Sequence, residues 1–109
     1  MASDHGFTIS THVLDTARGA PAAGVAVSLD APGADGAWAT LEEAVTDADG
    51  RAGPLAGGDP PGPRRLVFDT RAHAAFFPEV AIAFLPAPDE HTHVPLLLSP
   101  YGYTTYRGS

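Results

Sequence analysis

Turn-forming residues interrupt this chain so often that it cannot build long regular elements. Its 109 residues include 12 glycines and 11 prolines. Together with aspartates they separate short segments in which apolar and polar residues alternate, the pattern of β-strands with one buried face. No repeat and no linker composition divides the sequence. Residues 1–109 are therefore expected to form a single all-β domain, a small antiparallel β-sandwich.

Alternation assigns the N-terminal segment to a strand with one apolar face. Phe7, Ile9 and Val13 share that face, which places His12 on the opposite, more polar side. Further strands are expected over residues 25–30, 38–46, 66–69 and 80–84.

The middle of the chain contains its strongest turn signals. Residues 46–51 predict a tight turn in which Gly50 takes a positive φ and Arg51 emerges at the end. The segment 52–63 is so rich in glycine and proline that it is expected to be a loop. Residues 70–76 are expected to hold one or two helical turns, the short helix of an otherwise all-β fold.

A second strand with a polar face follows near the C-terminus. Strict alternation over 91–98 places His91, His93 and Pro95 on one face. Pro95 has no N–H to donate to a ladder. The strand is therefore expected to be an edge at that point or to carry a bulge.

The last four residues carry an aromatic hydroxyl, a cation, a glycine and a serine, with no polar tail after them. Chain ends are usually disordered, so this end is expected to fold inward and to be used. Alternation places Tyr106 on the face opposite Arg107 and Ser109. All three can reach one ligand only if Gly108 bends the chain or a second subunit closes the site.

Composition excludes several classes of function. With 13 acidic and 6 basic residues the net charge is -7, which argues against binding nucleic acid or an anionic membrane. All six cations are arginines, and Arg64 and Arg65 are expected on the surface. The absence of lysine and cysteine excludes Schiff-base and P-loop chemistry, thiol nucleophiles, disulfides and thiolate metal sites. No leader or membrane-spanning apolar segment is recognised, so a soluble, cytoplasmic protein is expected.

Three separated blocks carry a resemblance to a known family. They are residues 10–15 (STHVLD), 46–51 (TDADGR) and 91–109 (HTHVPLLLSPYGYTTYRGS). In this order they resemble the 5-hydroxyisourate hydrolases, transthyretin-related enzymes of urate breakdown, over nearly the whole chain. The sequence departs from the family pattern at Thr92, where an aromatic residue is frequent, and in a shorter, Ala-rich stretch between Phe68 and Phe76.

The resemblance implies a transthyretin-like (prealbumin-like) sandwich with one short helix. It also implies a homotetramer whose active sites lie at subunit interfaces, and no cofactor or metal. The implied reaction is the hydrolysis of 5-hydroxyisourate to 2-oxo-4-hydroxy-4-carboxy-5-ureidoimidazoline, on the route from urate to allantoin.

By the same resemblance, the functional residues of the first two blocks and of the start of the third are His12, Arg51 and His93. Opening a cyclic amide requires an activated water, an oxyanion stabiliser and a proton for the leaving nitrogen. The two imidazoles suit the proton steps near neutral pH, with either one as the base. The planar guanidinium of Arg51 suits the carbonyls of an oxidised purine. His12 and Arg51 are also expected to contact the substrate.

The terminal block supplies the remaining assignments. Tyr106 is expected to stack on the flat substrate or to hydrogen-bond to it, and Arg107 to pair with its carbonyls. Ser109 is expected to contribute to catalysis through its hydroxyl or its carboxylate.

Three other interpretations remain open at this point. His12, His91 and His93 could hold zinc with a water in the open position. The protein could be a transthyretin-like carrier of small ligands without catalysis, or a Greek-key structural module. A calcium loop at 47–50 is rejected because the bidentate glutamate of such a loop is missing.

Overall fold

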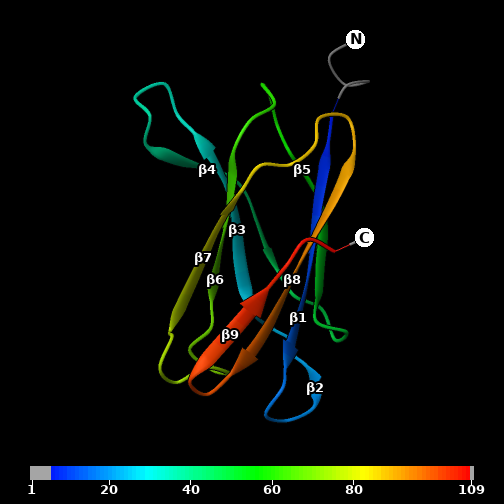
Figure 1. The fold of residues 1–109 in the computed structure, drawn as a ribbon, viewed down its shortest axis with the longest axis vertical. Coiled ribbons are helices and arrows are strands. Elements are labelled where there is room, and N and C mark those ends of the chain that lie inside the picture. The colour runs from blue at the N-terminus through cyan, green and yellow to red at the C-terminus, as the bar shows by residue number, and fades with distance from the viewer. Residues whose placement is uncertain (1–5, 109) are drawn as a thin grey trace.

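The protein is a sandwich of two β-sheets, seen in a computed structural model that describes residues 6–108 (Figure 1). One sheet has the strand order β2-β1-β8-β9, with β5 also paired to β1, and the other has the order β4-β3-β6-β7. The strands are β1 (Thr8–Asp15), β2 (Ala20–Pro21), β3 (Ala26–Pro32), β4 (Trp38–Val45), β5 (Arg51–Ala56), β6 (Arg64–Asp69), β7 (Glu79–Phe84), β8 (His91–Ser99) and β9 (Gly102–Thr105). The all-β sandwich expected from the sequence is confirmed.

The short helix expected over 70–76 is wrong, since residues 6–108 contain no helix. The carbonyl of Thr70 accepts hydrogen bonds from the N–H groups of His73 and Ala74 at 3.0 and 2.9 Å, which closes a single turn. The Thr70 hydroxyl then bonds to the Phe77 carbonyl, so the chain turns back at once into β7. Nothing in the described part of the chain is a helix long and apolar enough to cross a membrane.

One strand pair is parallel in this otherwise antiparallel sandwich. β1 runs alongside β8 from Thr8 opposite His91 to Asp15 opposite Leu98, and every other pairing between strands is antiparallel. The first and the last long strands of the chain are therefore neighbours in the middle of one sheet (Figure 1). Pro95 is paired on the β1 side only, because the pairing of β8 with β9 begins at Leu96.

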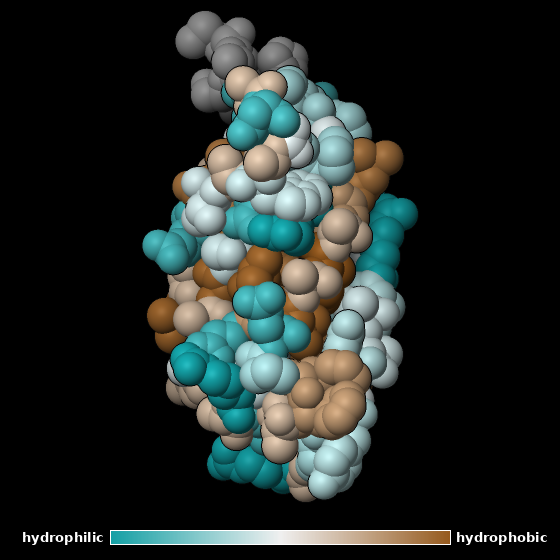
Figure 2. Space-filling model, turned by 90° about the vertical axis from the view of Figure 1, so that its left-hand side faces the viewer, coloured by the Kyte–Doolittle hydropathy of each residue, from teal (hydrophilic) through white to brown (hydrophobic). Residues whose placement is uncertain are grey.

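The core lies between the sheets and contains the apolar face of each strand. The faces predicted by alternation are confirmed in β1 and β8, where Ile9, Val13, Leu96 and Leu98 are fully buried. On the side of the molecule where β7 forms the sheet edge, apolar side chains gather in the middle of the surface between polar groups (Figure 2).

The segment 52–63 is only partly a loop, because β5 occupies its beginning. β5 tolerates glycine and proline since it pairs with one strand alone, β1. The register of this pair shifts between Ile9 and Thr11, a bulge that brings Gly53 against the β1 backbone. A Cβ atom at Gly53 would lie 2.9 Å from the Ile9 carbonyl oxygen.

Arg64 is buried, contrary to the surface position expected for it, whereas the Arg65 side chain remains 31% exposed. The Arg64 guanidinium donates hydrogen bonds to three backbone carbonyls of the segment before β6, those of Gly57, Pro60 and Pro63, at 2.6–2.8 Å. Because these carbonyls replace water around the cation, the side chain can be buried while its hydrogen bonds go to the backbone.

Candidate active site

The outward face of β1, β5 and β8 brings together three residues that the sequence assigned to catalysis. On β1, His12 lies opposite Arg51 of β5, and Ser10 lies opposite His93 of β8. The parallel register of β1 and β8 places His93 next to the strand that carries His12. Residues that are about 80 positions apart in the sequence therefore share one surface.

The turn between β4 and β5 orients His12 and Arg51. Asp47 accepts hydrogen bonds from the N–H groups of Asp49 and Arg51 at 2.9 and 3.0 Å, and Gly50 has a φ of 78°. A Cβ atom at Gly50 would come within 2.4 Å of the Val13 carbonyl oxygen, so the close approach of this turn to β1 requires glycine.

This turn also determines the tautomer of His12. The Asp49 carbonyl lies 2.8 Å from His12 Nε2. A carbonyl can only accept, so Nε2 carries the hydrogen and Nδ1 has the free lone pair of the neutral ring. Arg51 is exposed, and no carboxylate within residues 6–108 forms an ion pair with it. Its guanidinium is available to a ligand.

His93 is partly buried and is held at two points. Its Nδ1 lies 2.8 Å from Ser10 Oγ, and its carbonyl accepts a hydrogen bond from the Gly108 N–H at 2.8 Å. Burial of the ring is the main effect that lowers the pKa of His93 from its ordinary value of 6.5, and the positive charge of Arg51 lowers it further. The imidazole is therefore neutral at pH 7 and can accept a proton.

A cavity of about 340 Å³ opens over this face. It is lined by Thr8, Ser10, Thr11, Arg51, Ala52, Gly53, Pro54, His91 and His93. A neutral imidazole and an unpaired guanidinium thus border one space, the combination needed to activate a water and to stabilise an oxyanion.

His91 also lines this cavity, although the sequence analysis considered it only as a zinc ligand. Its Nδ1 lies 2.6 Å from Thr8 Oγ1 and its Nε2 lies 2.8 Å from Ser10 Oγ. The spacing of two residues from His93 was the signal that could have identified it, because that spacing puts both rings on one face. Within residues 6–108, no three His, Asp or Glu side chains are placed to hold a metal ion.

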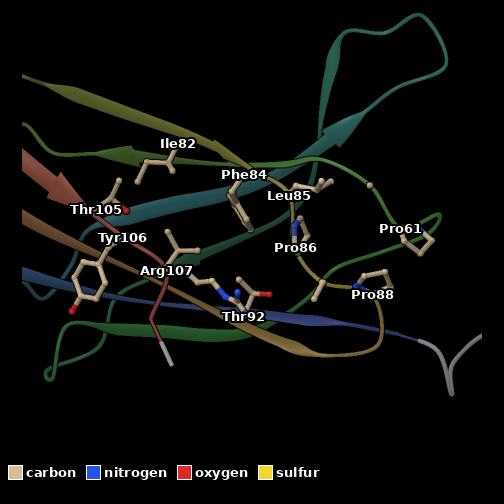
Figure 3. A pocket seen from close by; sticks show the side chains of 13 residues that line it. Pro61, Ile82, Phe84, Leu85, Pro86, Pro88, Thr92, Thr105, Tyr106 and Arg107 are labelled. Carbon is tan, nitrogen blue, oxygen red and sulfur yellow. The ribbon is translucent and has the colours of Figure 1, made fainter.

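Tyr106 and Arg107 do not line this cavity. They line a second, mostly apolar cavity of about 640 Å³ next to Phe84, Leu85 and the prolines that follow β7 (Figure 3). Both reach this cavity because β9 ends at Thr105, after which the strict alternation of a strand no longer applies.

Three further residues complete the comparison with the sequence assignments. Thr92, where the sequence analysis noted a departure from the family pattern, lines the second cavity with a small side chain. The outward face of β1, β5 and β8, which carries His12, Arg51, His91 and His93, is called the histidine face. Gly108 is the residue of the terminal block that contacts this face, through a bridge to His93. Ser109 lies outside the described residues.

Comparisons with known proteins show which family this chain belongs to. Residues 9–108 match the model of the HIUase/Transthyretin family. A 5-hydroxyisourate hydrolase of Caulobacter vibrioides is 46% identical over 93% of this chain and 97% of its own length. The uric acid degradation bifunctional protein TTL of Arabidopsis thaliana is 44% identical over 93% of this chain, which spans 37% of that longer protein.

Solved structures of two kinds share the fold. The Klebsiella pneumoniae 5-hydroxyisourate hydrolase superposes with a TM-score of 0.78 and 36% identity, and covers 94% of this chain and 99% of its own. Sea bream transthyretin in complex with thyroxine superposes with a TM-score of 0.81 and 30% identity, and covers 92% of this chain and 93% of its own. The family match over nearly the whole chain, together with relatives at more than 40% identity, shows that this protein belongs to the HIUase/Transthyretin family.

Proposed function

We propose that this protein hydrolyses 5-hydroxyisourate to 2-oxo-4-hydroxy-4-carboxy-5-ureidoimidazoline in the degradation of urate. The observation that carries the proposal is the cavity that a neutral His93 and an unpaired Arg51 border together. Relatives that match nearly all of this chain at 42–46% identity are named 5-hydroxyisourate hydrolases. The transthyretin structures, at 30–31% identity, are less similar in sequence.

The proposed mechanism uses groups that border the cavity or flank it. His93 takes a proton from a water molecule, whose oxygen attacks the carbonyl carbon of the cyclic amide. The guanidinium of Arg51 stabilises the negative charge that develops on the carbonyl oxygen. The C–N bond then breaks, and the leaving nitrogen receives its proton from His93. His12, with its tautomer set by Asp49, orients the substrate or the water through Nδ1.

We also propose that the active form is a homotetramer with each site at an interface between subunits. The histidine face is the outer surface of its sheet, and Tyr106 and Arg107 of the same protomer line a different cavity. A second subunit placed over this face would supply these two residues, and Ser109, which follows them in the sequence, in trans. Light scattering combined with activity measurements tests this assembly, because fully active monomers would contradict it. A single domain over 1–109, a cytoplasmic location and the absence of a cofactor stay predictions.

The activity is tested by generating 5-hydroxyisourate from urate with urate oxidase and following its decay spectroscopically. The wild type should accelerate the decay. Arg51→Ala should lower kcat about 10²- to 10³-fold, as expected for the loss of an oxyanion donor, and His12→Ala should also lower the rate. A chelator should have no effect.

The carrier is the second candidate, and the same assay separates it from the enzyme. The observation that favours a carrier is the similarity to a transthyretin solved with thyroxine. A folded, tetrameric wild type that leaves the decay of 5-hydroxyisourate unchanged, yet binds thyroxine in an equilibrium titration, would establish the carrier function instead.

A further inference from the structure

A chain of hydrogen bonds leads from His93 to the exposed end of the histidine face. His93 Nδ1 lies 2.8 Å from Ser10 Oγ, the same oxygen lies 2.8 Å from His91 Nε2, and His91 Nδ1 lies 2.6 Å from Thr8 Oγ1. All these distances are within hydrogen-bond range. His93 is partly buried, whereas His91 is exposed, so the chain connects the cavity with solvent.

The single hydrogen of a serine hydroxyl restricts how this chain can be protonated. Ser10 Oγ can donate to one imidazole nitrogen only, and it must accept from the other. With both rings neutral and Ser10 donating to one of them, either His93 donates to Ser10 and Ser10 donates to His91, or both bonds run in the opposite direction. Passage of one proton through the chain converts the first state into the second, and each ring then carries its hydrogen on its other nitrogen.

The proposed reaction produces a proton that has to leave the site. Water supplies two hydrogens, and one of them goes to the leaving nitrogen. The other stays on the new carboxylic acid, which ionises because carboxyl groups have pKa values near 4. Each turnover at neutral pH therefore releases one proton next to His93, where the positive charge of Arg51 and burial of the ring disfavour an imidazolium.

We propose that Ser10 and His91 form a proton relay that carries this proton from His93 to solvent. The proton of the carboxylic acid moves to His93 Nε2 while His93 passes its Nδ1 hydrogen to Ser10 Oγ. Ser10 passes its own hydrogen to His91 Nε2, and His91 releases its Nδ1 hydrogen beside Thr8. His93 is again neutral at the end, and the hydrogen of each ring now lies on Nε2. The chain is restored when both rings return to the Nδ1–H tautomer by exchanging protons with water. Ser10 and His91 act through His93 and are positioning residues for it.

This inference rests on the proposed function, and it goes beyond the residues assigned from the sequence. Its test measures kcat and KM of Ser10→Ala and His91→Gln in dilute buffer, and again with increasing imidazole. Both variants should lose at least about tenfold in kcat, a modest share of a typical proton-transfer contribution, while KM stays unchanged. Added imidazole should restore kcat by removing the proton directly. Ser10→Thr keeps the hydroxyl and should stay within about twofold of wild type.

A purely structural role of Ser10 predicts a different result. In that case imidazole would not restore the rate, and the loss would appear in KM as well as in kcat. Either finding, or wild-type kcat in both variants, overturns the relay while leaving the hydrolase intact. A wild type without hydrolase activity overturns both the relay and the proposed function, so the two failures are distinguishable.

Discussion

Replacing Gly108 by alanine should damage the active site through a single added methyl group. A Cβ atom at Gly108 would lie 2.7 Å from His93 Cδ2 and 3.2 Å from the His93 carbonyl oxygen. Ordinary van der Waals contact begins near 3.4 Å. The ring or the terminal segment must therefore move by roughly 0.7 Å to accept the methyl group. The Gly108 N–H also bonds to that carbonyl, so the two cannot separate without losing this bond.

The expected loss of kcat follows from the sensitivity of catalysis to the position of the reacting groups. A displacement near 1 Å of a reacting group costs about 10²-fold in rate, so Gly108→Ala should lower kcat about 10- to 100-fold. Stability should change little, because the change removes at most one backbone hydrogen bond, worth about 1 kcal/mol. Kinetics with 5-hydroxyisourate and urea denaturation of the same preparation measure the two effects.

Gly102→Ala is the matched control. Neither Gly102 nor Gly108 has a positive φ, so backbone strain is the same for both substitutions. The Cβ atom at Gly102 would meet only Ser99 Oγ, at an ordinary 3.5 Å. This variant should keep wild-type kcat. Wild-type kcat in Gly108→Ala, or equal losses in both variants, would refute the reasoning that the end of the chain positions His93.

Three further predictions concern charge. Burial, and then the charge of Arg51, lower the pKa of His93 below 6.5. In an NMR titration the imidazole resonances of His93 should therefore have a midpoint below that pH, and Arg51→Gln should move the midpoint upward. An unchanged midpoint would contradict an effect of the Arg51 charge on His93. Asp15 pairs with His73 at 2.9 Å, and this hydrogen bond is the main effect that lowers the Asp15 pKa below 3.8. The stability from this carboxylate is therefore present above pH 3.8 and is lost as the pH falls through the lowered pKa. Asp15→Asn should reduce the free energy of unfolding by about 2 kcal/mol at pH 7, the value of a hydrogen bond to a charged group. The reduction should become progressively smaller below pH 3.8, and a pH-independent difference in urea denaturation would contradict this assignment. Arg64→Met should lower the free energy of unfolding, measured by urea denaturation, by about 3 kcal/mol, because it leaves three carbonyls without a donor. A variant as stable as the wild type would show that water replaces the guanidinium.

Local pattern predicted the parts of the fold that depend on local sequence. The buried faces of β1 and β8 follow from a period of two, so Ile9 and Leu96 could be assigned to the core without a structure. The parallel pairing of these two strands could not be predicted that way, because it depends on the relation of segments about 80 residues apart. Residue propensity also failed at β5, where an edge position and a bulge allow Gly53 and Pro54 within a strand.

The site also combines features that the sequence predicted with features that depend on distant segments. The resemblance singled out His12, Arg51 and His93, and the structure places them on neighbouring strands. The spacing of two residues placed His91 on the same face as His93, but the link between the two rings through Ser10 could not be predicted, because it depends on the pairing of β1 with β8. The burial of Arg64 was equally hidden, since its partners are backbone carbonyls, which have no signature in the sequence.

The parallel pair of β1 and β8 lies in the middle of its sheet, so this sheet can be completed only after β8 has been synthesised. Thr8 meets His91 across 83 residues, so closing that contact requires all the strands between them to have been synthesised. During translation β1 emerges before β8 and has to wait for this central partner. Such long-range closure gives a high contact order and slow folding. The histidine face is thus completed only after β8 has been made, and apolar strands that lack their partners before that point favour aggregation.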